Sequence, residues 1–306
     1  MRNCPALSPP RAGASEQGGY NNGTVDEHGN ISIQIEEDKL SKITSDMVKN
    51  WAKDMGANIV GIAPVDRFEG APSGHGPRDL LPEAKSVIVA GTRIPDVIVD
   101  YDKYHLKFQE MPQHIAVGAA VHNLYLLMGH YTIDIMLNSL AMRIANKLEI
   151  EAGYRAFPTP NTSDTGLGHP VEGYQTSYFS QRHAATRAGL GEFGFNNIVL
   201  TPEFGPRVRF VSIITEAELE PDPLLTRKVC LRESCGGKDG PICLQKCTPR
   251  AIQPRDGINN DDIFIDPPSK TNMYLCVGAG ETEVFQCVYY GTCMRVCPIK
   301  LKLKKG

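Results

Sequence analysis

Eight of the nine cysteines in this chain of 306 residues lie between Cys230 and Cys297. They form two groups of four with the spacings C-x4-C-x7-C-x3-C and C-x10-C-x5-C-x3-C. The groups are Cys230, Cys235, Cys243 and Cys247, and Cys276, Cys287, Cys293 and Cys297. Four thiolates are what one iron–sulfur cubane needs, so the chemistry that these residues indicate is electron transfer through two clusters.

Both groups end in an x3-C step with a proline one or two residues later, which is similar to the C-x2-C-x2-C-x3-C-P run of bacterial two-cluster ferredoxins. The longer early gaps contain glycines, whose backbone can wrap closely around a cluster. In those ferredoxins the fourth cysteine of each run binds the other cluster. If this crossover holds, the ligand sets are Cys230, Cys235, Cys243 and Cys297, and Cys276, Cys287, Cys293 and Cys247.

Two other uses of the thiols compete with this interpretation. Structural zinc sites also take four thiolates each, but they usually combine two short C-x2–4-C steps, which neither group has. Disulfides require an oxidising compartment, and the N-terminal stretch lacks the features of a secretion signal. Iron–sulfur chemistry is favoured, and zinc is the main alternative.

Length and charge limit the other functions that the chain can have. A charged fraction of 22% and a hydrophobic fraction of 41% are an ordinary soluble balance. A net charge of −3 and a pI near 6.3 provide no basic field for nucleic acid or for an anionic membrane. We find neither an apolar run of membrane-spanning length nor paired export arginines, and expect a cytoplasmic protein without a membrane or nucleic-acid partner.

Composition divides the chain into three parts. Residues 1–35 are rich in Gly, Asn, Ser and Pro without any period, which predicts a disordered or loosely held tail. Residues 36–222 carry helical and strand patterns and are predicted to form an α/β (α+β) domain. Pro221 and Pro223 mark the linker to the cysteine-rich residues 223–306.

Apolar periodicity predicts the elements of the middle part. In residues 40–55, apolar side chains recur at intervals of three and four residues, which indicates a helix that ends at Gly56. The segments 58–63 and 86–90 read as strands with two apolar faces, typical of a sheet covered by helices on both sides. The longest helical pattern runs over residues 113–152, with Gly129 as a possible interruption. Three histidines lie in or near this stretch, and His130 lies one turn before Asp134. We expect these histidines to have surface roles and not to bind a metal.

A long irregular segment and a glycine-rich stretch follow. Residues 154–158 predict a short strand, and residues 159–180 an irregular segment of a length that is usually functional. The segment 181–190 predicts a helix. Residues 196–201 and 207–215 predict two strands joined by a turn of prolines and a glycine.

A resemblance to a known group of proteins begins at Ala188. The stretch AGLGEFGFNNIVLTPEFGPRVR ends at Arg209 and closely resembles the AGLGELGRNG…TPEFGPRVR stretch of corrinoid reductive dehalogenases. It is also similar to the AGLGW-containing stretch of epoxyqueuosine reductases, and residues 51–88 look like the opening helix and strands of both families. With the eight downstream cysteines, the resemblance covers roughly residues 40–300.

The resemblance implies a nitroreductase-like domain that binds a cobalamin, followed by a small two-cluster ferredoxin-like domain. Two [4Fe-4S] clusters would pass electrons to the cobalt. Gly189, Gly191, Gly194 and Asn196 would contact the cobalamin, because glycines leave room for a flat ring and have N–H groups for amide and phosphate oxygens. The competing interpretation is that these glycines only form a turn between a helix and a strand.

The implied activity is the reductive cleavage of a carbon–halogen, epoxide or similar bond in a small-molecule substrate. An external ferredoxin or flavodoxin would supply the electrons. Tyr174, Tyr178 or Glu172 would donate a proton to the product, and Arg207 would stabilise developing negative charge. For the tyrosines, packing is the competing role.

A second hypothesis belongs to another class of protein. The chain would be an electron-transfer or corrinoid-reactivating protein that reduces the cofactor of a partner and has no substrate of its own. Such a protein needs the clusters but no proton donor.

Overall fold

The computed structural model describes residues 23–25, 31–33, 42–100, 125–161, 170–171, 174–175, 178–272, 275–276 and 291–301. The chain divides into two compact units, Met1–Leu40 and Ser41–Gly306. In the first unit, β1 (Gly23–Val25) and β2 (Ile31–Ile33) form an antiparallel hairpin in a stretch where the sequence predicted no element. The predicted boundary near residue 222 lies inside the second unit and remains a prediction.

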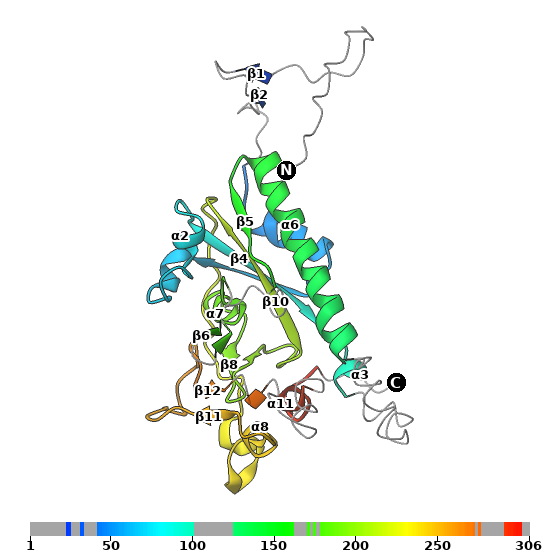
Figure 1. Cartoon of the computed structure of the whole chain (residues 1–306), viewed down its shortest axis with the longest axis vertical. Helices are drawn as coiled ribbons and strands as arrows, with labels where there is room; N and C mark the ends of the chain where they lie inside the picture. Colours follow the sequence, from blue (N-terminus) through cyan, green and yellow to red (C-terminus); the bar gives the residue numbers. More distant parts are fainter. Residues whose placement is uncertain are drawn as a thin grey trace, which may run out of the picture. The chain divides into compact units, whose positions relative to one another are not determined.

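An antiparallel sheet of four strands forms the centre of the second unit (Figure 1). The strand order is β3–β4–β10–β5. The strands are β3 (Ile59–Pro64), β4 (Ser86–Arg93), β5 (Ala156–Pro158) and β10 (Val208–Thr215). The two central strands pair along their whole length, from Ser86 opposite Thr215 to Arg93 opposite Val208.

Helices cover both faces of this sheet, as the apolar strands predicted. Along β4, Ile88 and Ala90 point into the core that includes the residues of α6, whereas Val87 and Val89 point into the core that includes α7. Successive side chains of a strand point to opposite faces, so this central strand contributes to two hydrophobic cores at once. The mixed α/β architecture is therefore confirmed.

The long helix of the unit packs against β5 and β10 (Figure 1). It begins as a π-helix, η4 (Tyr125–Thr132), and continues as α6 (Ile133–Ala152). Gly129 lies within the π-helical part, where the sequence anticipated an interruption, and Gly153 ends α6 with a left-handed φ of 71°. Among the described residues, no helix combines the length and apolar character needed to span a membrane.

The remaining elements of the sheet region are short. Helix α1 (Ser45–Asp54) is capped by the Thr44 side chain, begins later than its apolar pattern, and packs against β3. Two further helices are α3 (Asp96–Val99), which follows β4, and α7 (Gln181–Arg187), which precedes the glycine motif. The others are η2 (Val65–Phe68), α2 (Pro77–Leu80), β6 (Pro170–Val171), β7 (Tyr174–Gln175), β8 (Glu192–Phe193) and β9 (Val199–Leu200).

The described residues of the cysteine-rich part form short elements. They are η5 (Arg232–Cys235), η6 (Gly237–Asp239), α8 (Ile242–Gln245), β11 (Ile252–Pro254), β12 (Ser269–Thr271) and α11 (Thr292–Arg295). Strands β11 and β12 pair with each other, and α8 lies against α11. Because the described elements are short, side-chain contacts are important in holding them in place.

The two strands predicted over residues 196–215 do not pair with each other. Strand β9 pairs with β8, and β10 joins the central sheet. The turn between β9 and β10 is closed by the bridge of Thr201 and Gly205. The pairing of β10 with β4 then begins at Val208, directly after Arg207. Alternation of side chains predicts a strand but does not reveal its partner.

Two positions of α6 test the packing of this helix. Leu148 is fully buried and Ile150 is 65% exposed. Replacing Leu148 by Ala should lower the free energy of unfolding by about 2–5 kcal/mol, because it leaves a cavity against the sheet. Replacing Ile150 by Ala should change it by less than about 0.5 kcal/mol. Denaturant unfolding measures both, and equal losses would contradict the orientation of the helix.

Candidate functional site

Four thiols from distant parts of the chain line one cavity. They belong to Cys230, Cys235, Cys243 and Cys297. Gly194 and Asn196 of the glycine motif line the same cavity, together with Leu231. The structure thus brings together the set that the ferredoxin crossover assigns to one cluster. Their role as iron ligands remains a prediction.

Two short helices explain how the last cysteine joins the first three. Helix α8 contains Cys243, and α11 contains Cys293, the third cysteine of each group. Each helix ends before the fourth cysteine of its group, and the two helices lie against each other. Cys297 therefore leaves α11 on the side of the first group.

Burial makes two thiols of this cavity hard to ionise without a positive partner. Burial, together with the nearby thiols of Cys230, Cys235 and Cys297, raises the pKa of Cys243 to about 12. Burial also raises the pKa of Cys297 to about 11, against the opposing effects of a hydrogen bond at Ile299 and the charge of Arg207. Thiols bind a metal or cluster as thiolates, so a cationic centre here must displace protons.

The cysteines that the crossover assigns to the other cluster do not line this cavity, as far as the structure describes them. Cys247 is buried and lines another pocket together with Arg250. Cys276 and Cys293 are partly buried, and Cys287 lies outside the described residues. Among the residues that the structure describes, no three His, Cys, Asp or Glu side chains are close enough to share a single metal ion.

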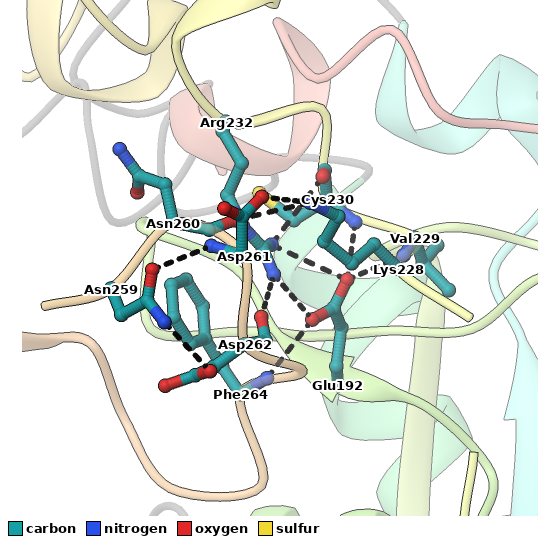
Figure 2. A network of polar contacts seen from close by, with 10 residues as sticks. All are labelled: Glu192, Lys228, Val229, Cys230, Arg232, Asn259, Asn260, Asp261, Asp262 and Phe264. Carbon is teal, nitrogen blue, oxygen red and sulfur yellow. Dashed lines mark hydrogen bonds and ion pairs between the residues drawn. The ribbon is translucent and has the colours of Figure 1, made fainter. Parts of the chain in front are cut away.

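The carboxylate of Glu192 connects the glycine motif to the first cysteine (Figure 2). Glu192 is fully buried at the start of β8. It accepts hydrogen bonds from the backbone N–H groups of Val229, Cys230 (2.7 Å) and Phe264 (3.0 Å). Glu192 lies inside the motif at residues 188–209, where the sequence predicted functional roles only for the glycines among the first seven residues. An acidic residue within an apolar, glycine-rich stretch was the available signal.

Arg232 completes the charge of this network. Its Nη2 lies 2.9 Å from Oε2 of Glu192 and donates to the carbonyl of Asp262 at 2.6 Å, while the guanidinium stacks 3.9 Å from the ring centre of Phe264. Burial lowers the pKa of Arg232, but hydrogen bonds and charge from Glu192 and Cys230 raise it above its usual value. The side chain therefore stays charged, and the carboxylate is compensated.

The glycines of the motif are packed against the chain itself. A Cβ atom on Gly189 would lie 2.0 Å from the carbonyl oxygen of Pro223, and one on Gly191 would lie 2.4 Å from that of Leu200. The N–H groups of Gly189 and Gly194 donate to Thr186 and Ile198. The expectation that these two N–H groups are available to a ligand is therefore wrong, because the backbone already uses them.

Asn196 and the neighbouring turn contact the second half of the cysteine-rich part. The Asn196 amide donates to the carbonyl of Cys293 at 3.4 Å. A Cβ atom on Gly205 would lie 2.0 Å from the carbonyl oxygen of Ile299, two residues after Cys297. The glycine motif and its turn therefore support both cysteine groups, and the cofactor-binding role of these residues remains a prediction.

Arg207 lies in a buried ion-pair network. Its side chain is fully buried and donates to Asp96 at 2.7 Å and to Asp100 at 2.9 Å. Lys300 approaches Asp100 to 3.5 Å. This network fastens the turn before β10 to α3 and to the segment after Cys297. The guanidinium group of Arg207, which was predicted to stabilise developing negative charge, is thus paired with two carboxylates. The catalytic role of Arg207 remains a prediction.

The predicted proton donors are not brought to the thiol cavity by any described contact. Tyr178 is 48% exposed, and its carbonyl faces the ring of His75. Tyr174 lies in β7, and Glu172 lies outside the described residues. Their catalytic roles remain predictions.

A polar cluster on the long helix was not recognised from the sequence. Arg209 donates to both carboxylate oxygens of Asp134, at 2.7 and 3.1 Å, and the ring of His130 lies beside both. Asn161, at the start of the irregular segment, donates to the same carboxylate at 2.9 Å. Tyr125 is buried nearby, which raises its pKa. His130 thus contacts structural partners, and its side chain is 17% exposed, so the expected surface role is not what the structure shows.

Comparisons with known proteins support the resemblance. The chain is 27% identical over 232 residues to the tetrachloroethene reductive dehalogenase of Dehalobacter restrictus, a match that covers 68% of this chain and 38% of that protein. It is 30% identical over 130 residues to the epoxyqueuosine reductase of Staphylococcus aureus, covering 40% and 30% of the two chains. No family model matches the sequence. The chain thus spans well under half the length of these relatives.

The fold points to the same proteins. A crystal structure of epoxyqueuosine reductase with a tRNA stem loop superposes with a TM-score of 0.51 at 19% identity, over 83% of this chain and 64% of that one. The chain is therefore similar to the superfamily of reductive dehalogenases and epoxyqueuosine reductases, which are oxidoreductase enzymes. The predicted resemblance is confirmed.

Gly205 tests the contact between the turn and the segment of Cys297. Replacing Gly205 by Ala adds a left-handed penalty of about 1–2 kcal/mol and a collision with the backbone of Ile299, which should cost at least about 2 kcal/mol more. Gly257 has a similar φ, 72°, and open space around it, so its Ala variant is the matched control. Similar losses of unfolding free energy in both variants would contradict the contact.

His183, next to the N-cap Ser180 of α7, gives the fold a dependence on pH. Burial and the charges of Arg187 and Arg182 lower its pKa from 6.5 to about 4. The unfolded chain then binds a proton before the folded one, so stability present above pH 6.5 is lost as the pH falls toward 4. Replacing His183 by Gln should reduce the loss between pH 7 and 5 by about 1–2 kcal/mol, allowing for partial exposure. Unchanged pH dependence in urea unfolding would oppose this assignment.

Proposed function

We propose that the chain is an iron–sulfur, cobalamin-dependent oxidoreductase that carries out a reductive cleavage. The observation that carries the proposal is the cavity lined by Cys230, Cys235, Cys243 and Cys297 beside the glycine motif. These cysteines are separated by up to 67 positions in the sequence, yet they line one cavity, which supports the crossover of a two-cluster ferredoxin.

The donor set of this cavity fits a cubane cluster. It offers four thiols and, at Gly194, a lining residue without a side chain; a Cβ atom there would lie 2.6 Å from the Asn196 amide oxygen. A [4Fe-4S] cluster supplies one-electron transfer when it is bound. Apolar residues, among them Leu200 and Ile242, line the cavity beside the thiols. We assign the remaining four cysteines to a second cluster, and residues 223–306 to a ferredoxin-like domain.

Cobalamin and the nitroreductase-like description of residues 36–222 come from the resemblance. The amide groups of Gly189 and Gly194 do not fit as donors to the ring, since both are bonded within the chain. The role of a proton donor stays assigned to Tyr174, Tyr178 or Glu172, which belong to the irregular segment before α7 in the sequence.

The substrate is a compound whose carbon–halogen, epoxide or similar bond is cleaved by electrons from an external ferredoxin or flavodoxin. The relatives are tetrachloroethene and epoxyqueuosine reductases, and one solved relative is bound to a tRNA stem loop. The substrate is therefore either a small molecule or a nucleic acid, and the net charge of −3 favours the small molecule. Eight cysteines that serve as cluster ligands require a reducing compartment such as the cytoplasm.

The alternative is an electron-transfer or corrinoid-reactivating protein. It is favoured by the exposed position of Tyr178 and by the pairing of Arg207 with two carboxylates. Replacing Tyr174, Tyr178 and Glu172 by Phe, Phe and Gln separates the two functions. The variant should lose turnover of a substrate if the chain is an enzyme, and should keep the reduction of a partner if it is not.

Iron analysis tests the proposal directly. Anaerobically purified protein should contain about eight iron atoms per chain and, after growth with cobalamin, about one cobalt. Replacing Cys243 by Ser should reduce the iron to about four, because one cluster loses a buried ligand. Cys4 lies far from both groups in sequence, and its Ser variant is the control that should keep all the iron. Colourless protein with zinc in place of iron would refute the proposal.

A further inference from the structure

A buried pair of opposite charges lies next to the first two thiols of the cavity. The side chain of Glu192 has no exposed surface, and that of Arg232 is 8% exposed. Their charged groups are 2.9 Å apart (Figure 2). Charges removed from water are screened weakly by salt and solvent, so each one changes the potential at the neighbouring groups.

Both members of the pair touch the backbone of cysteines that line the cavity. Glu192 accepts the N–H of Cys230 at 2.7 Å, so this N–H is committed to a carboxylate. Arg232 donates to the carbonyl of Cys230 at 3.3 Å, and its own carbonyl lies 3.2 Å from the sulfur of Cys235. Arg232 also has a left-handed φ of 58°, which turns the chain between the two cysteines.

We propose that Glu192 and Arg232 are positioning residues that set the reduction potential of the cluster held by Cys230 and Cys235. The inference rests on the proposed function, because it presupposes that cluster. Reduction adds one negative charge to a cluster, and the charge and hydrogen bonds around it shift its potential. The carboxylate opposes reduction, the guanidinium favours it, and the paired arrangement keeps the two effects in balance.

The two charges predict opposite effects. Glu192→Gln keeps the size and an acceptor oxygen but leaves the guanidinium uncompensated, so the potential of the cluster should rise. Arg232→Gln leaves the carboxylate uncompensated, so the potential should fall. The double variant removes both charges and should return close to the wild-type value. A redox titration of the full chain, followed by electron paramagnetic resonance, measures all three shifts.

Lys228 provides a matched control on the same segment. It lies two residues before Cys230, contacts the carbonyl of Asn260 as Arg232 does, and pairs with Asp261, but its side chain is 42% exposed. Solvent screens such a charge, so Lys228→Gln should leave the potential unchanged.

The outcomes separate this inference from the proposed function. If the wild-type protein contains no iron, both the inference and the proposed function are refuted. Iron-loaded single variants with the wild-type potential, or with shifts in one direction, would overturn the inference and leave the proposed function standing. If the single variants lose their iron, the double variant decides: restored iron supports a requirement for balanced charge, and continued loss shows that the pair has only a structural role.

Discussion

The cysteine-rich part depends on one buried carboxylate that belongs to another part of the sequence. Glu192 lies on β8 and holds the N–H groups of Val229, Cys230 and Phe264, while Arg232 neutralises its charge. A buried charge is costly unless it is paired and fully hydrogen-bonded, and this one is both. Two loops with little secondary structure are thereby fixed to a strand. This contact helps to fix the position of the first cysteine relative to the glycine motif.

The glycine motif acquires a physical meaning from the same arrangement. Its glycines allow the backbone to approach Pro223 and Leu200 at distances that no side chain permits. The turn that follows does the same at Ile299, next to Cys297. Gly189 and Gly205 thus contact the chain at the beginning and at the end of the cysteine-rich part. Close packing of the backbone explains why such a motif accompanies eight cysteines in this chain.

Much of the fold followed from local patterns in the sequence. The apolar strands with two buried faces predicted β3 and β4, and the helical period predicted α1 and α6. The spacing of the cysteines predicted a set of four that the structure brings to one cavity. Each of these signals is a pattern of apolar residues within a short stretch or a regular spacing of cysteines.

The contacts that hold the site together could not be read in this way. Glu192 and Arg232 are 40 positions apart, and Arg207 is 111 positions from Asp96. Nothing in the local sequence distinguishes a buried, paired arginine from one that meets a substrate. The pairing of β9 with β8 was missed for a different reason, because the alternation of side chains within residues 196–201 does not identify the partner strand.

The central claim is that the last cysteine of the second group completes the site of the first group. A crystal structure of the anaerobic protein, with anomalous scattering recorded at the iron edge, locates the metal directly. The account predicts a four-iron site bounded by Cys230, Cys235, Cys243 and Cys297. A site that contains Cys247 in place of Cys297, or a single zinc ion among these thiols, would contradict it.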